Sequence, residues 1–272
     1  MFLLSTCSLF QASTITLQDC LIRRGLEYNI LDPVGLPAVS GRDFVGRVFL
    51  CGENVTQFKP GDRVAGLLKA GGNAHYTEVS QASLVSVPKR IDSGEAACMV
   101  SVYATAYQAV SQATRNTNGN ELEGKRVLVV GGMDGVGQAI VQICRKAKAD
   151  VFVTAPDRRH AYIRSILKAT PLPENSNEWA SIVSGSMDYV FDGVCDGEME
   201  PSFKSLNESG KCVCFGTSSF LKDEMGWFGV PLQRRFDIFK LETTANFEHF
   251  NLWESYARDP ELYKVGSRKR NT

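Results

Sequence analysis

The feature that most constrains the fold is a strand, turn and helix pattern at residues 127 to 143, VLVVGGMDGVGQAIVQI. An apolar run, a glycine cluster and an amphipathic run in this order predict the unit that holds a dinucleotide pyrophosphate at a helix N-terminus. The spacing departs from the strict G-x-G-x-x-G fingerprint, because a series from Gly132 to Gly137 has Asp134 in its middle. The backbone comes closest to a pyrophosphate there, so a carboxylate has the wrong charge.

Asp134 has two interpretations. Its carboxylate can cap the following helix, which is a common role for Asp at a helix start. It would then use the N–H groups that a pyrophosphate needs, so the side chain must either compete with the ligand or turn away from it.

Strands and helices alternate after this unit. Apolar strands are expected at VFVTA, YVFDGV and CVCFG, with helices near residues 158–169 and at PSFKSLN. Continuous apolar strands between helices predict a parallel sheet that is covered on both faces. With right-handed crossovers, the expected α/β fold is a doubly wound Rossmann-type sheet.

The segment before this unit has a different pattern of residues. Residues 39–90 consist of short β-rich runs with turn residues between them, such as KPGD, and predict a small antiparallel barrel or sandwich. An Ala-rich stretch follows, with a capping-box-like opening at Ser93, and predicts one or more helices. We therefore expect two domains, at residues 1–100 and 101–272.

Composition narrows the classes of partner. The 272 residues carry a formal net charge of zero and are 43% hydrophobic, so nothing in them indicates a nucleic-acid or membrane partner. The eight cysteines include no C-x-x-C pair, and the three histidines are dispersed, so no metal site is expected. Cys212 and Cys214 alternate on an expected strand and are interpreted as buried thiols, which favours a reducing, cytoplasmic compartment.

The order of these features resembles a known family, the zinc-independent quinone oxidoreductase-like branch of the medium-chain dehydrogenase/reductase superfamily. The segments that carry the resemblance are GRDFVGRV, FKPGDRVAGL, NAHYTEV, EAA, TAY, GKRVLVVGGMDGVGQAIVQ, DYVFDGV and GKCVCFG. The resemblance implies a GroES-like catalytic domain, a Rossmann domain and NADPH in the cleft between them. It also implies hydride transfer to a small-molecule quinone or α,β-unsaturated carbonyl, and a homodimer.

Two positions separate the chain from the zinc-dependent relatives. Thr16 stands where their catalytic Cys would be, and Arg42 replaces the His of their Gly-His-Glu segment. An always-charged guanidinium cannot ligate a cation, so metal-independent chemistry is expected. Tyr28 and Tyr76 are candidate hydroxyl donors to the substrate, with ordinary packing as the alternative, and backbone N–H groups can also polarise the carbonyl.

The choice of dinucleotide depends on the end of the second Rossmann strand, VFVTAP. NAD-binding units have an acidic residue there, but this chain has Ala155, followed by Asp157, Arg158 and Arg159. Small residues followed by guanidinium groups suit a 2′-phosphate, while Asp157 opposes it. The sequence therefore favours NADPH over NADH.

The candidate cofactor residues come from the glycine turn, from the second strand and, by resemblance, from two further segments. Thr105 matches a threonine near the nicotinamide in the family, although an ordinary helix position is the alternative. The full set is Thr105, Gly131, Gly132, Asp134, Gly135, Val136, Gly137, Thr154, Arg158, Arg159, Phe215 and Gly216.

The resemblance also implies strands before ITLQD and a return segment after CVCFG, so both domains are expected to be shortened. An alternative function follows, in which a non-catalytic relative keeps the fold as a binding or assembly module. Asp134, Thr16 and the short ends favour that alternative.

Overall fold

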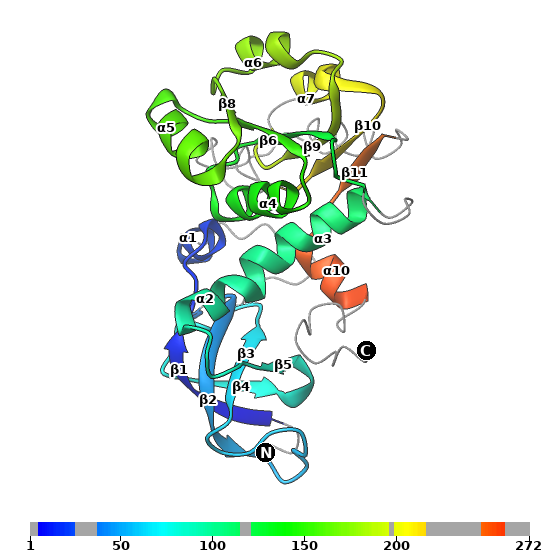
Figure 1. Ribbon diagram of the computed structural model, residues 1–272. Coiled ribbons are helices and arrows are strands. Elements are labelled where there is room, and N and C mark those ends of the chain that lie inside the picture. Colours follow the sequence, from blue (N-terminus) through cyan, green and yellow to red (C-terminus); the bar gives the residue numbers. More distant parts are fainter. Residues whose placement is uncertain (1–4, 25–36, 115–120, 196–198, 216–245, 259–272) are drawn as a thin grey trace. The chain divides into compact units, whose positions relative to one another are not determined.

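The computed structural model describes residues 5–24, 37–114, 121–195, 199–215 and 246–258 (Figure 1). The chain divides into two compact units, one comprising residues 1–104 with 253–272 and the other residues 105–252. Of the described C-terminal residues, 253–258 thus group with the first unit.

The first unit is built on a five-stranded antiparallel sheet in the order β4-β1-β2-β3-β5. The strands are β1 (Ser5–Ala12), β2 (Asp43–Cys51), β3 (Arg63–Leu67), β4 (Tyr76–Ser80) and β5 (Leu84–Ser86). Alternate side chains of these strands form a small core of Phe44, Val48, Val64, Val79 and Leu84. The predicted β-rich antiparallel unit is therefore confirmed.

Helices complete the first unit. They are α1 (Leu17–Arg23), a 3₁₀ turn (Gln81–Ser83), α2 (Ser93–Cys98), a π-helical turn (Met99–Tyr103) and α10 (Leu252–Arg258). The start of α2 corrects one expectation, because Asp92 rather than Ser93 is the cap and accepts hydrogen bonds from the N–H groups of Gly94 and Glu95. Within this unit, Tyr256 of α10 donates a hydrogen bond to Ser83 Oγ at 3.3 Å.

The second unit contains a six-stranded parallel sheet in the order β11-β10-β9-β6-β7-β8. Its strands are β6 (Arg126–Val130), β7 (Asp150–Thr154), β8 (Thr170–Leu172), β9 (Met187–Asp192), β10 (Leu206–Cys214) and β11 (Phe247–His249). When the sheet is read from β8 to β11 and its strands are numbered along the chain from β6, the order is 3-2-1-4-5-6, which is the Rossmann arrangement. The predicted doubly wound sheet is confirmed.

Among the described helices of the second unit, the first precedes β6 and the others follow β6, β7, β8 and β9 in turn. They are α3 (Ala104–Ala113), α4 (Gly135–Lys146), α5 (His160–Tyr162), α6 (Ser176–Val183) and α7 (Glu200–Ser205). A 3₁₀ turn (Asp157–Arg159) precedes α5 and a π-helical turn (Ile163–Leu167) follows it. The short β8 and α6 were not expected from the sequence.

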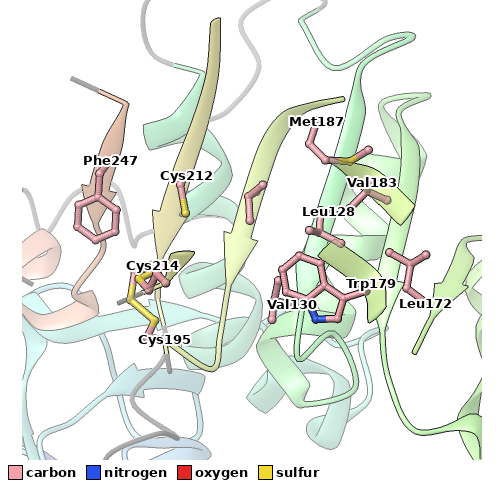
Figure 2. Close-up of a cluster of buried hydrophobic side chains, with 12 residues drawn as sticks. Leu128, Val130, Leu172, Trp179, Val183, Met187, Cys195, Cys212, Cys214 and Phe247 are labelled. Carbon is pink, nitrogen blue, oxygen red and sulfur yellow. A yellow bond between two sulfur atoms is a disulfide. The ribbon is translucent and has the colours of Figure 1, made fainter. Parts of the chain in front are cut away.

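One face of this sheet packs into a buried cluster that includes Leu128, Val130, Trp179, Val190 and Phe247. Cys212 and Cys214 belong to the same cluster, as their alternation predicts. The expectation that both are thiols is wrong for Cys214, whose sulfur is joined to that of Cys195 in a disulfide (Figure 2). Because these two cysteines are paired, the cysteines support a reducing compartment less strongly than the sequence predicts.

Candidate functional site

A pocket of about 1070 Å³ opens at the carboxyl edge of the parallel sheet. The ends of β6, β7 and β9 and the segment after β8 form its wall. The chain passes from β6 to β7 on one side and later returns to β9 on the other, so the pocket lies at the topological switch point where α/β sheets bind ligands. Its lining comprises Val130, Gly131, Met133, residues 154–158, 173–176, Glu178, Trp179, Asp192, Val194, Met199, Pro201 and Ser202.

The turn between β6 and α4 depends on three glycines. Gly131 has φ +73°, a conformation that other residues rarely adopt, and its N–H donates to Thr154 Oγ1 at 3.0 Å. A Cβ on Gly132 would lie 2.6 Å from Val153 Cγ1, and one on Gly137 would lie 2.7 Å from the Cα of Gly132. The helix therefore approaches the strands as closely as a dinucleotide-binding turn requires.

Asp134 is the N-cap of α4. Its carboxylate Oδ1 accepts the N–H of Gly137 at 2.5 Å, so the capping interpretation is confirmed. Burial of the carboxyl group in the turn raises its pKa above the ordinary value, and the hydrogen bond from Gly137 opposes this rise. One N–H of the helix start is thus already engaged by a protein carboxylate.

The end of β7 forms the next part of the wall. Ala155 is buried where an NAD-binding unit would have its acid, and His160 Nε2 lies 3.0 Å from its carbonyl oxygen. Arg158 is exposed and is the one cation among the described lining residues. The same lining contains three exposed carboxylates, those of Asp157, Glu174 and Glu178.

The end of β9 is organised by Asp192, which the sequence analysis did not identify as a site residue. Its Oδ1 accepts the N–H groups of Val194 and Cys195, each at 2.9 Å, and its Oδ2 accepts Ser202 Oγ at 2.6 Å. Phe215 N–H donates to its main-chain carbonyl at 3.0 Å. An Asp-Gly pair directly after an apolar strand, as in YVFDGV, was the available signal.

The structure brings several of the candidate cofactor residues together. Gly131, Thr154 and Arg158 line the pocket. The remaining turn residues, Gly132, Asp134, Gly135, Val136 and Gly137, form the segment between β6 and the first turn of α4. Phe215 lies against Gly193 at the end of β9, since a Cβ on that glycine would be 2.8 Å from the Phe215 ring.

Other candidates lie elsewhere. Thr105 is in the first turn of α3 and Arg159 ends the 3₁₀ turn, and neither lines this pocket. Tyr76 lies on the edge strand β4 of the first unit, half exposed, with its ring centroid 5.4 Å from that of Phe49. Tyr28 and Gly216 lie outside the described residues.

In the first unit, the carboxylates near the positions of the missing zinc ligands accept hydrogen bonds from other groups of the protein. Asp19 accepts the N–H and hydroxyl of Thr16 at 2.7 and 2.9 Å, and the N–H of Gly41 at 2.7 Å. Asp43, fully buried, accepts the hydroxyls of Thr14 and Ser101. Burial raises the pKa of Asp43, while these hydrogen bonds oppose the rise. These bonds make the two carboxylates structural acceptors for their own unit.

The chain is similar in sequence to known oxidoreductases. Residues 10–110 match the model of the alcohol dehydrogenase GroES-like domain. A chloroplastic quinone-oxidoreductase homolog of Spinacia oleracea is 27% identical over 209 residues, which are 75% of this chain and 63% of that protein. The GroES-like match, this homolog and the solved structures support the medium-chain dehydrogenase/reductase superfamily for this chain. Within it, the match to that homolog supports the quinone oxidoreductase-like branch.

Solved structures of the superfamily share the fold. An alcohol dehydrogenase superfamily protein from Novosphingobium aromaticivorans superposes with a TM-score of 0.71 at 26% identity, covering 97% of this chain and 76% of that one. The JamJ enoyl reductase gives 0.76 at 21% identity, covering 96% and 77%. The chain spans less than two thirds of the length of the curated relatives it matches, 63% for the spinach protein.

Among the described residues, no helix combines the length and the apolar character that a membrane span needs.

Proposed function

We propose that this protein is an NADP(H)-dependent oxidoreductase that transfers hydride to a quinone or an α,β-unsaturated carbonyl without a metal ion. The observation that carries the proposal is the pocket at the carboxyl edge of a 3-2-1-4-5-6 sheet, next to the close-packed turn from Gly131 to Gly137. Superfamily membership supports oxidoreductase chemistry, and the names of the quinone oxidoreductase and enoyl reductase relatives support the class of acceptor.

The residues present fit a nicotinamide dinucleotide, which supplies the hydride when bound. In this proposal, Gly131 and the turn hold the pyrophosphate, and Thr154 fixes the turn through its bond to Gly131 N. Arg158 holds the 2′-phosphate, and Ala155 leaves room where an acid would repel it. Because three exposed carboxylates share the lining, we expect only a modest preference for NADPH over NADH.

Metal-independent chemistry is supported by Thr16 and Arg42, which replace two ligands of the zinc-dependent relatives. The acceptor carbonyl is then polarised by hydrogen-bond donors of the protein. Tyr28 and Tyr76 stay predictions for that role. A homodimer and a cytoplasmic location also belong to this proposal, and light scattering on the purified protein tests the first.

Two measurements test the proposal. NADPH at a 100-fold excess over its dissociation constant should stabilise the protein by about 2.7 kcal/mol, which is seen as a rise in melting temperature. Oxidation of NADPH, followed as the loss of absorbance of its reduced nicotinamide, should accelerate when a quinone or an enone is added. The absence of any melting shift with both dinucleotides would refute the enzyme proposal.

A specific observation favours a second function, a binding module without catalysis. The Asp134 carboxylate already occupies the Gly137 N–H, so binding of a pyrophosphate there is weakened. A melting shift with NADPH but no turnover with any quinone or enone would support this second function over the first.

A further inference from the structure

The disulfide between Cys195 and Cys214 joins two segments at the pocket edge of the sheet. Cys214 ends β10 and pairs in register with Asp192 at the end of the parallel neighbour β9, while Cys195 lies in the loop after β9. Their Cα atoms are 6.2 Å apart, within the ordinary range for a disulfide. Figure 2 shows the joined sulfurs, with Cys212 one pleat away on β10.

The cross-linked loop forms part of the pocket wall. Asp192 and Val194 line the pocket, and the Asp192 carboxylate accepts the N–H groups of Val194 and Cys195. Cys195 has φ +50°, a left-handed conformation that is unfavourable for a residue with a Cβ. The disulfide therefore restrains a wall segment that would gain by relaxing if the bond were opened.

We propose that the Cys195–Cys214 disulfide is reversible and sets the conformation of residues 193–195, the described part of the loop after β9, so that thiol–disulfide exchange regulates the pocket. The part of this proposal that concerns the cofactor rests on the proposed function, whereas the effect on the loop does not. The bond and the loop it holds are both in the second unit.

The chemistry needs a peroxide for oxidation and a dithiol for reduction. In oxidation, one cysteine thiolate attacks a peroxide oxygen, the O–O bond breaks, and a sulfenic acid and water or an alcohol form. The second thiol attacks that sulfur, and water leaves as the S–S bond forms. In reduction, a dithiol reductant opens the bond through a mixed disulfide, and its own second thiol then releases the second cysteine. The reductant ends as a disulfide after losing two electrons.

The other buried cysteines of this unit are poor competitors. Burial raises the pKa of Cys144 to about 12, and burial followed by the charge of Asp192 raises the pKa of Cys212 well above its ordinary value. Both therefore remain thiols, which are weak nucleophiles. Cys212 is thus a matched control on the same strand.

The test compares the full chain after treatment with hydrogen peroxide and with a dithiol reductant. Non-reducing peptide mapping should recover Cys195 joined to Cys214 in the oxidised protein only. Hydrogen exchange at the Val194 and Cys195 amides should be about tenfold slower in the oxidised form. A factor of about ten corresponds to the free energy that one residue gains when it leaves the left-handed conformation. The dissociation constant for NADPH should then differ between the two forms.

Variants isolate the pair. The double variant Cys195→Ser with Cys214→Ser should exchange at one rate under both treatments, whereas Cys212→Ala should keep the difference. If the double variant does not fold, the comparison of oxidised and reduced wild type decides alone.

Two outcomes would overturn the inference: no Cys195–Cys214 peptide in the oxidised protein, or equal exchange in the two forms. If NADPH binds neither form, the proposed function fails, and the exchange rates still decide whether the disulfide sets the loop.

Discussion

The carboxylate of Asp134 accepts the Gly137 N–H that a bound pyrophosphate would otherwise receive. One side chain therefore stabilises the start of α4 and lowers the affinity of the turn for an anion. Asp is a strong N-cap, and Asn is about equal to it, so the two effects can be separated by substitution.

Asp134→Asn is expected to tighten NADPH binding by about tenfold, because it removes the negative charge and keeps the cap. Asp134→Gly should tighten binding similarly, with a loss of only a few tenths of a kcal/mol in the free energy of unfolding. Calorimetric titration measures the affinity. Unchanged affinity in both variants would mean that the carboxylate does not oppose the ligand.

Asp43 predicts a pH dependence of stability in the first unit. Burial raises its folded pKa above the unfolded value near 3.8, so the folded state holds this proton more tightly. Its contribution to stability is complete below the unfolded pKa and is lost as the pH rises through the folded pKa. Asp43→Asn should reduce the fall in urea midpoint over this interval. An equal fall in the variant would contradict the assignment.

At the scale of elements, the β6-turn-α4 unit is the part of the fold that the sequence specifies most fully. A Cβ at Gly132 would collide with Val153 at 2.6 Å, so Gly132→Ala should lower the free energy of unfolding by about 1–3 kcal/mol. Gly185→Ala is a matched control, since its Cβ meets nothing within 4 Å and only its φ of +61° costs stability, about 1 kcal/mol. Equal losses in the two variants would show that the close approach is unimportant.

Long apolar strands were predictable and short ones were not. The apolar runs at β6, β7, β9 and the end of β10 (Cys212–Cys214) are continuous, so their pattern identified them. In contrast, β8 has only three residues including a proline, and α6 has two turns, so neither carries a clear period. The segment between them supplies part of the pocket wall, and that wall was missed with it.

The disulfide could not be predicted from the sequence either. Its cysteines are 19 residues apart, and only the parallel pairing of β9 with β10 brings them together. Asp192 was missed for the same reason, because its partners come from the following loop, from α7 and from Phe215 directly after β10. Local patterns identified the glycine turn, whereas the opposite wall depends on contacts between distant segments.

At the scale of the whole molecule, one pocket determines the choice of cofactor in the proposed function. Arg158→Ala should raise the Michaelis constant for NADPH several-fold, about 1 kcal/mol, and leave that for NADH nearly unchanged. Arg159→Ala is the matched control, because Arg159 does not line the pocket and should affect neither. Equal effects of Arg158→Ala on both dinucleotides would refute the 2′-phosphate role.

Fluorescence of Trp179 tests the central claim most directly, because this side chain lines the pocket. Titration of the full chain with NADPH should quench tryptophan emission in a saturable way through energy transfer to the nicotinamide. Trp179→Phe should retain binding by calorimetry and lose most of the quenching. Saturable quenching that disappears in this variant is the result that the account predicts. Binding with undiminished quenching in Trp179→Phe, or no binding of either dinucleotide, would contradict it.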